Sequence, residues 1–277
     1  MPGRGPSDPD ARNEQFWRDY LMNYSRAQAA TRPYFSRLPS SPRCQLCGSP
    51  FHGFGGRLMQ LIGKAQSTTN PRMCNQCEKV MLKHHGGAEV PGTMLFADIR
   101  GSTAMAEHMT PGEFHDLLNR FSTVASETVF AHNGLVDKFV GDEVVAVFAP
   151  VFGPDHVKRA VDAGLALLRA TGHADPDGPW VPVGAGVHTG QVWFGAVGDG
   201  GYVEMTVLGD PVNVTARLAA AATAGELLVS TDAADAAGLD ATLERRSLDL
   251  KGKQESTQVV SLRVTGDPAA DQPRSSA

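Results

Sequence analysis

Two aspartates in this sequence stand where a divalent metal ion could be held. Asp98 ends the apolar run Leu95-Phe96-Ala97, and Asp142 lies between two further apolar runs, directly after Gly141. If these runs are neighbouring strands, both carboxylates reach one point. Magnesium and manganese prefer such oxygen ligands, and two ions could activate a hydroxyl and neutralise a leaving pyrophosphate. Taken alone, each aspartate is explained as readily by a helix cap or a turn.

Groups that could bind phosphate lie directly after Asp98 and in a second segment that begins at Asp210. Gly101, Ser102 and Thr103 follow Asp98 and begin a predicted helix, whose free N–H groups can donate to phosphate oxygens. In a second predicted helix, opened by Asp210 as N-cap and Pro211, Asn213 and Arg217 are four residues apart and share one face. An amide and a guanidinium there suit a site where phosphate charge develops, although an exposed polar face is the commoner explanation.

The four cysteines form two C-x-x-C pairs, Cys44 with Cys47 and Cys74 with Cys77. In a reducing compartment such pairs indicate a metal site before disulfides. Zinc in a four-thiolate site is the first choice, because a module of about 40 residues has too small a core to fold unaided. An iron–sulfur cluster is the second choice and a dithiol redox switch the third. A purely structural role for the metal is favoured over sensing.

The elements that must position the two aspartates alternate between strand and helix patterns over residues 92–265. Their mixed order, with hairpins, predicts an α+β domain rather than a purely parallel sheet. A loop at 85–92 is expected to lead into it. Strands are expected at 93–99, 135–140, 144–148, 181–187, 192–197, 202–208, 227–230, 242–249 and 256–264, and helices at 110–132, 157–171 and 210–222.

Composition divides the rest of the chain into two terminal segments, a helical segment and the four-cysteine module. Residues 1–12 and 266–277 are rich in Pro, Asp and small residues and are expected to be disordered. Residues 13–39 have helical character. Residues 43–85 form the four-cysteine module, in which six Lys or Arg face one Glu. This basic charge could attract nucleic acid, but a solvated face is the commoner explanation, so no nucleic-acid partner is expected.

The bulk numbers favour a globular protein of one or two domains. The chain has 277 residues, 42% of them hydrophobic, and a net charge of −5, which exerts no global attraction toward nucleic acid or anionic membranes. No stretch approaches the roughly 20 apolar residues that a membrane span requires, and no signal segment opens the sequence. A cytoplasmic protein without a membrane span is therefore expected.

Together these motifs resemble the catalytic domain of class III adenylate and guanylate cyclases. The resemblance covers about residues 92–264 and is carried by 95–103, 138–143, 184–190 and 207–218. It implies a ferredoxin-like α+β domain, here preceded by a zinc-ribbon-like module, that acts as a homodimer with shared active sites. It further implies two Mg²⁺ or Mn²⁺ ions per site, held by Asp98, Asp142 and the backbone of Ile99, with the triphosphate at Gly101–Thr103.

The resemblance assigns the remaining roles to the partner protomer. Asn213 and Arg217 would serve the ribose and the transition state, and Lys138 and Thr206 would read the purine. Lys251 resembles the family's phosphate-binding lysine.

The base-reading pair decides the expected substrate. Lys with Thr resembles the adenylate-forming type, whereas guanylate cyclases resemble Glu with Cys at these positions. A Lys donor matches the adenine ring nitrogen, and a mismatched buried donor costs about 1–3 kcal/mol. The sequence therefore predicts conversion of ATP to cyclic AMP and pyrophosphate, with the cysteine module in a regulatory role. The alternative is a non-catalytic, nucleotide-sensing domain fused to a zinc-type binding module. His188 could serve as a base, but a structural role is favoured for it.

Overall fold

The structure is a computed structural model of the chain, and it describes residues 9–23, 43–44, 46–68, 72–84, 86–198, 204–248 and 256–264. The chain divides into two compact units, which are described separately. The first comprises Met1–Pro91, Ala149–Pro154 and Gln191–Leu208, and the second comprises Gly92–Phe148, Asp155–Gly190 and Gly209–Ala277.

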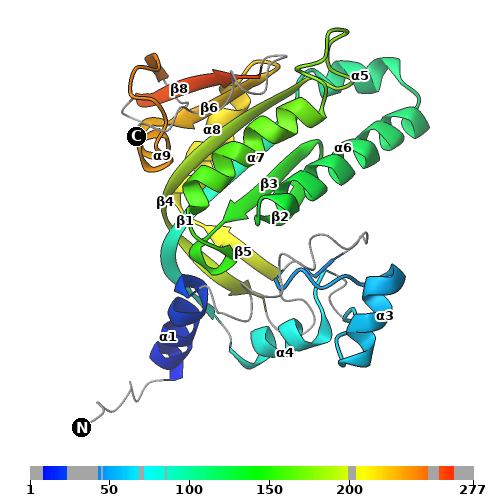
Figure 1. The fold of residues 1–277 in the computed structure, drawn as a ribbon, viewed down its shortest axis with the longest axis vertical. Coiled ribbons are helices and arrows are strands. Elements are labelled where there is room, and N and C mark those ends of the chain that lie inside the picture. The colour runs from blue at the N-terminus through cyan, green and yellow to red at the C-terminus, as the bar shows by residue number, and fades with distance from the viewer. Residues whose placement is uncertain are drawn as a thin grey trace. The chain divides into compact units, whose positions relative to one another are not determined.

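Helices and strands alternate along the chain (Figure 1). The helices are α1 (Pro9–Met22), α3 (Gly53–Leu61), α4 (Asn75–Lys83), α5 (Ser102–His108), α6 (Pro111–Ala131), η1 (Pro150–Phe152), α7 (His156–Ala170), α8 (Asp210–Ala221) and α9 (Thr231–Ala236). The strands are β1 (Gly86–Ile99), β2 (Leu135–Val140), β3 (Glu143–Phe148), β4 (Val183–Val197), β5 (Glu204–Leu208), β6 (Glu226–Ser230), β7 (Arg245–Leu248) and β8 (Thr257–Arg263).

The strands form one mixed sheet in the order β2-β3-β1-β4-β6-β8-β7, with β5 paired to β4. β4 and β6 are parallel, whereas β1–β3, β2–β3, β6–β8 and β7–β8 are antiparallel. The predicted α+β class is confirmed. The register of β1 and β3 places Asp98 opposite Glu143, and this pairing builds the candidate active site.

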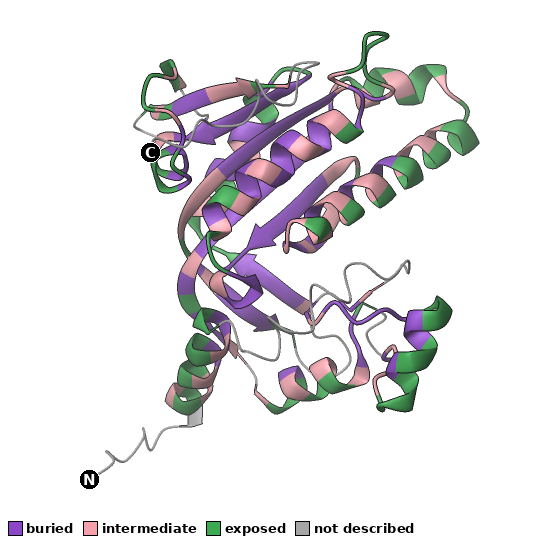
Figure 2. Ribbon diagram, in the orientation of Figure 1, coloured by how far each residue is buried: buried purple, intermediate pink, exposed green. Residues whose placement is uncertain are grey.

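The core of the second unit lies between the sheet and helices α6 and α7. Phe121 of α6 and Leu168 of α7 are almost fully buried, as are Leu95 and Phe148 of the strands. Figure 2 shows the buried face of α7 along these strands. Gly164 permits the close approach, because a Cβ there would lie 2.9 Å from the side chain of Leu227.

Several predicted elements agree with the structure. α6 begins with the expected capping box, in which the Thr110 side chain accepts from the backbone N–H of Glu113 and the Glu113 carboxylate accepts from Thr110. The hairpin of β2 and β3 is also confirmed.

The two strand runs at 181–187 and 192–197 were wrongly divided, because they form the single strand β4. Gly190 lies inside the strand, where a Cβ would come 2.7 Å from Pro211. This glycine therefore serves close packing and not a turn. The loop predicted at 85–92 is also wrong from residue 86 onward, because β1 begins at Gly86. A Cβ at Gly87 would lie 2.5 Å from the carbonyl oxygen of Phe194.

In the first unit, α1 begins at Pro9, four residues before the predicted start of the helical segment at residue 13. Residues 9–12 are thus helical, which suits a proline and Asp10 in the first turn. Trp17 is fully buried and its indole N–H donates to the His84 carbonyl oxygen at 2.8 Å. Residues 24–39, where the helical segment was expected to continue, lie outside the described residues, as do 1–8 and 266–277.

Within the described part of the chain, no helix is both long and apolar enough to cross a bilayer.

Candidate active site and metal centre

The structure brings Asp98 and Asp142 together at one end of the sheet. Asp98 is the penultimate residue of β1, and Asp142 lies in the turn that follows β2, where Gly141 adopts a φ of 63°. Burial raises the pKa of Asp98 to about 6, and hydrogen bonding with Asp142 raises it further in the same direction. The two carboxyl groups therefore lie close enough to influence each other's ionisation, as two carboxylate ligands of one cation would.

Glu143 is a third carboxylate at this place, to which the sequence analysis gave no role. It is half-buried in β3 opposite Asp98. Burial, followed by the charges of Asp98 and Asp142, raises the pKa of Glu143 to about 7. The pairing of β1 with β3 is the signal that reveals it, because Glu143 is the residue opposite Asp98 in that register.

Arg100 is the cation of this site, and it too was missed. Its guanidinium forms an ion pair with the Asp98 carboxylate. One Nη atom donates to the carbonyl oxygens of Ala220 at 3.1 Å and Ala222 at 3.4 Å, at the C-terminal end of α8. The backbone N–H of Arg100 donates to Pro182 at 2.8 Å. Arg100 therefore connects the end of β1, which carries Asp98, to α8.

The predicted phosphate turn follows directly. Gly101 is the N-cap of α5 and has a φ of 73°, a backbone conformation that favours glycine. Ser102 and Thr103 begin the helix, and all three residues are exposed or half-buried. Their backbone N–H groups at the first turn are suited to donate hydrogen bonds to a ligand oxygen.

On α8, Asn213 is exposed and Arg217 is half-buried, whereas Val214 and Leu218 are buried against the sheet. The expected separation of a polar and an apolar face is present. The predicted N-cap is wrong, because Gly209, with a φ of 134°, caps α8 and Asp210 is its first residue. The Asp210 carboxylate still stabilises the N-terminus of α8 through its interaction with the helix dipole.

The predicted base-reading residues lie in different units. Lys138, in β2, is 34% exposed, and its Nζ lies 3.6 Å from Asp137. Thr206 is buried in β5 opposite Gly195. Lys251 lies outside the described residues. His188 accepts or donates a 2.7 Å hydrogen bond with the Ser230 hydroxyl, which agrees with the structural role favoured for it.

The four cysteines form the candidate metal centre of the first unit. Their sulfur atoms all lie within 4.8 Å of one another, and those of Cys47 and Cys74 are 3.8 Å apart. A tetrahedron with metal–sulfur bonds of about 2.3 Å has an edge of about 3.8 Å. The sulfur positions therefore fit one tetrahedral ion.

Local backbone supports these sulfurs. Cys74 is the N-cap of α4 and Cys77 lies in its first turn, so the second pair is presented by a helix start. The backbone N–H of Cys74 donates to the Cys44 sulfur at 3.3 Å, and the Lys64 ammonium lies 3.9 Å from Cys47. Such donors stabilise the thiolate form that binds metal.

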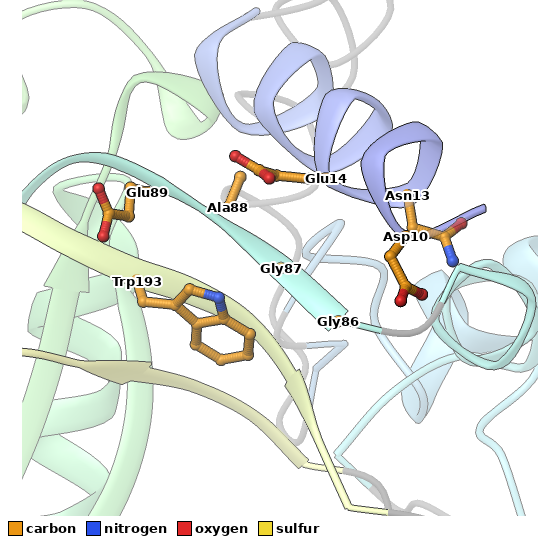
Figure 3. A pocket seen from close by; sticks show the side chains of 8 residues that line it. All are labelled: Asp10, Asn13, Glu14, Gly86, Gly87, Ala88, Glu89 and Trp193. Atoms are coloured by element: carbon orange, nitrogen blue, oxygen red, sulfur yellow. The ribbon is translucent and has the colours of Figure 1, made fainter. Parts of the chain in front are cut away.

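A separate pocket of about 380 Å³ lies in the first unit (Figure 3). Three carboxylates and the Trp193 indole contribute to its wall, and none of the predicted site residues does. An acidic wall disfavours a triphosphate by charge, so we do not assign nucleotide binding to this pocket. Its lining residues are Asp10, Asn13, Glu14, Gly86, Gly87, Ala88, Glu89 and Trp193.

Comparison with known proteins agrees with the fold. The family model described as "Adenylate and Guanylate cyclase catalytic domain" matches residues 88–262, and the chain belongs to this family. Among solved structures, the chain is similar to the guanylyl cyclase Cya2, with a TM-score of 0.59 and 28% identity over 68% of this chain and 100% of that one. It is also similar to the adenylyl cyclase CyaB from P. aeruginosa, with a TM-score of 0.56 and 26% identity over 68% of this chain and 98% of that one.

Sequence relatives include an uncharacterized protein of Mycobacterium tuberculosis, 35% identical over 64% of this chain. An uncharacterized protein of Mycobacterium bovis is 42% identical over 48% of it. The matched regions make up only 32% and 23% of those two proteins, so the chain spans a third or less of their length.

Proposed function

We propose that this protein is an adenylate cyclase, which converts ATP to 3′,5′-cyclic AMP and pyrophosphate at sites shared between two copies. The observation that carries the proposal is the meeting of Asp98 and Asp142 beside the Gly101 turn. An all-oxygen donor pair fits hard divalent cations, and the turn next to it offers N–H groups to a triphosphate. Family membership supports nucleotide cyclisation as the chemistry.

Two carboxylates and the Ile99 carbonyl would hold Mg²⁺ or Mn²⁺. When bound, the ions would increase the acidity of the ribose 3′-hydroxyl and neutralise the leaving pyrophosphate. In the reaction the 3′-oxygen forms a bond to the α-phosphorus, the bond from that phosphorus to the β-phosphate oxygen breaks, and the hydroxyl proton is released. The position of Asp98 near the end of β1 and of Asp142 in the hairpin turn supports this role.

The polar face of α8 supplies the remaining chemistry. Asn213 would orient the ribose, and Arg217 would donate to the phosphoryl oxygens as their charge develops. In the chain itself Asn213 is exposed and Arg217 is half-buried, whereas Val214 and Leu218 of the same helix are buried. Asn213 and Arg217 are therefore available to a site completed by a second copy, which is the arrangement that the family resemblance implies.

Lys138 and Thr206 support ATP as the substrate. Lys138 keeps a partly exposed ammonium, which can donate to the adenine ring nitrogen. Guanine presents an N–H at the corresponding place and leaves that donor unmatched.

Zinc is the metal we propose for the four-cysteine site. The 3.8 Å sulfur separation supports one ion with four thiolate ligands. In an iron–sulfur cluster the cysteines bind different iron atoms, which spaces their sulfurs more widely. We propose that this centre holds the small module together and that the module regulates the catalytic domain.

Turnover tests the proposal directly. The purified chain should form cyclic AMP from ATP faster than cyclic GMP from GTP, with Mg²⁺ or Mn²⁺. Asp98→Ala and Arg217→Ala should each reduce the rate by a factor on the order of 10²–10³ or more. Nucleotide binding without product in the unmodified protein would instead favour a nucleotide-sensing domain.

A further inference from the structure

Helix α3 of the cysteine module buries two glycines and Met59 and leaves its other large apolar residues exposed. Gly55, Gly56 and Met59 are buried. A Cβ at Gly56 would come 2.4 Å from the carbonyl oxygen of Phe51, so this glycine lets the helix backbone rest directly on the preceding chain. On the opposite side Phe54 is 80% exposed and Leu61 is 84% exposed. This is the reverse of the usual arrangement of an amphipathic surface helix.

The exposed apolar residues form one continuous stripe. Phe54, Leu58 and Leu61 follow the helical spacing of four and three, which places them within an arc of about 60°. Ile62 is the C-cap residue that follows them directly. We call these four residues the α3 stripe. Among the described residues nine large hydrophobic side chains are exposed, and four of them belong to this stripe. Their concentration indicates a binding surface, since single exposed hydrophobic residues are common but clusters are not.

The charges around the stripe are all of one sign. Arg57 lies on the adjoining turn and Lys64 follows the helix, and residues 53–64 contain no acidic residue. The whole module, residues 43–85, has six basic residues against Glu78. An apolar stripe flanked by Lys and Arg is the pattern of a helix that lies in the interface of an anionic bilayer.

We propose that the α3 stripe inserts into the headgroup region of an anionic lipid membrane and attaches the cysteine module to its surface. A second copy of this chain fits less well, because a two-fold contact would bring like charges at Arg57 together. The stripe is also small, with four side chains, whereas a stable dimer interface has roughly 20–30 residues a side. A nucleic acid would use the basic charge but has no need of the apolar stripe.

Vesicle binding of the full chain tests the proposal. The protein should sediment with vesicles of phosphatidylcholine mixed with phosphatidylserine, and much less with pure phosphatidylcholine. The double variant Phe54→Ser/Leu61→Ser should bind at least about tenfold more weakly, because each change removes a buried apolar side chain from the lipid. Arg57→Glu should weaken binding only to the anionic vesicles.

Met22→Ser is the matched control, because Met22 is 42% exposed on α1, outside the stripe, and Leu58 within it is 44% exposed. It should bind vesicles like the unmodified protein. Circular dichroism and metal content should be unchanged in every variant, so that loss of binding is not loss of folding. Absence of vesicle binding by the unmodified chain would overturn the proposal. Unchanged vesicle binding by the double variant would also overturn it. If the double variant instead had a lower oligomer mass and unchanged lipid binding, the α3 stripe would be a contact with a second copy of the chain.

Discussion

The Arg100 guanidinium joins the Asp98 carboxylate to the C-terminal end of α8. It forms an ion pair with that carboxylate and donates to the carbonyl oxygens of Ala220 and Ala222. The same helix carries Asn213 in its first turn and Arg217 in its second half. In a dimer with two shared active sites, Asp98 of one chain would belong to one site and α8 of the same chain to the other. Arg100 would then connect the two active sites.

Arg100→Ala should lower kcat/KM about tenfold, because it removes charge-assisted hydrogen bonds on both sides of the guanidinium. The Arg100 charge also holds down the pKa of Asp98 against the effect of burial. Without that charge the pKa rises above about 6, and the pH at which Mn²⁺ binding is half-maximal moves upward. Paramagnetic resonance of Mn²⁺ over about pH 5 to 8 measures this midpoint.

Arg100→Lys provides the control for charge. It should keep the midpoint near that of the unmodified protein, yet lose activity, because Lys lacks the planar fork that reaches both partners. An unchanged midpoint in Arg100→Ala would contradict the electrostatic role.

Asp98→Asn should stabilise the metal-free protein while abolishing activity. The folded-state pKa of Asp98 is raised from 3.8 to about 6, so its favourable contribution is complete below about pH 4 and is lost as the pH rises through 6. Near neutral pH the charged Asp98 carboxylate lowers the free energy of unfolding by about 1 kcal/mol, after allowance for its partial exposure. Urea unfolding with chelator should show a more stable variant at about pH 7.5 and no difference at about pH 4. Equal stability at both pH values would contradict the cost of the buried charge.

The sequence predicted most of the elements, because their signals are local. The capping box at Thr110 and Glu113 and the apolar runs around Gly141 each define an element without distant contacts. The roles of Gly87 and Gly190 could not be read in this way, since each glycine is required by a neighbour far along the chain. Both were therefore interpreted as loop or turn residues.

The same distinction holds for the candidate site. Asp98 and Asp142 were found because each follows a recognisable apolar run. Glu143 and Arg100 were overlooked because their importance depends on strand register and on contact with α8. The close contact of Gly56 with Phe51 likewise has no local signature in the sequence.

Removal of the metal should unfold the cysteine module and leave the catalytic domain folded. Metal analysis should find one zinc per chain and no visible colour, and chelation should increase amide hydrogen exchange in α3 and α4. Cys74→Ser should do the same, because it removes both a ligand and the N-cap of α4. Ser49→Ala, next to the site, should retain zinc. Unchanged exchange in α3 and α4 after complete metal loss would contradict a structural metal.

The pair Lys138→Glu and Thr206→Cys should shift the substrate preference toward GTP. The exchange replaces a donor matched to adenine by an acceptor matched to guanine, and each mismatch costs about 1–3 kcal/mol. The ratio of kcat/KM for ATP to that for GTP should fall about 10–100-fold. Thr206→Ser, which keeps the hydroxyl, should leave the ratio nearly unchanged. A ratio that does not respond to the double exchange would show that other residues read the base.

The most direct measurement mixes two inactive variants, Asp98→Ala and Arg217→Ala, and assays cyclic AMP formation from ATP. In a mixed dimer one site receives Asp98 from one chain and Arg217 from the other, so that site is intact. With random exchange half of the dimers are mixed, and the mixture should recover about a quarter of the unmodified activity. Recovery of cyclic AMP synthesis would support both the chemistry and the shared site. An active unmodified protein whose mixed variants remain inactive after subunit exchange would contradict the shared site.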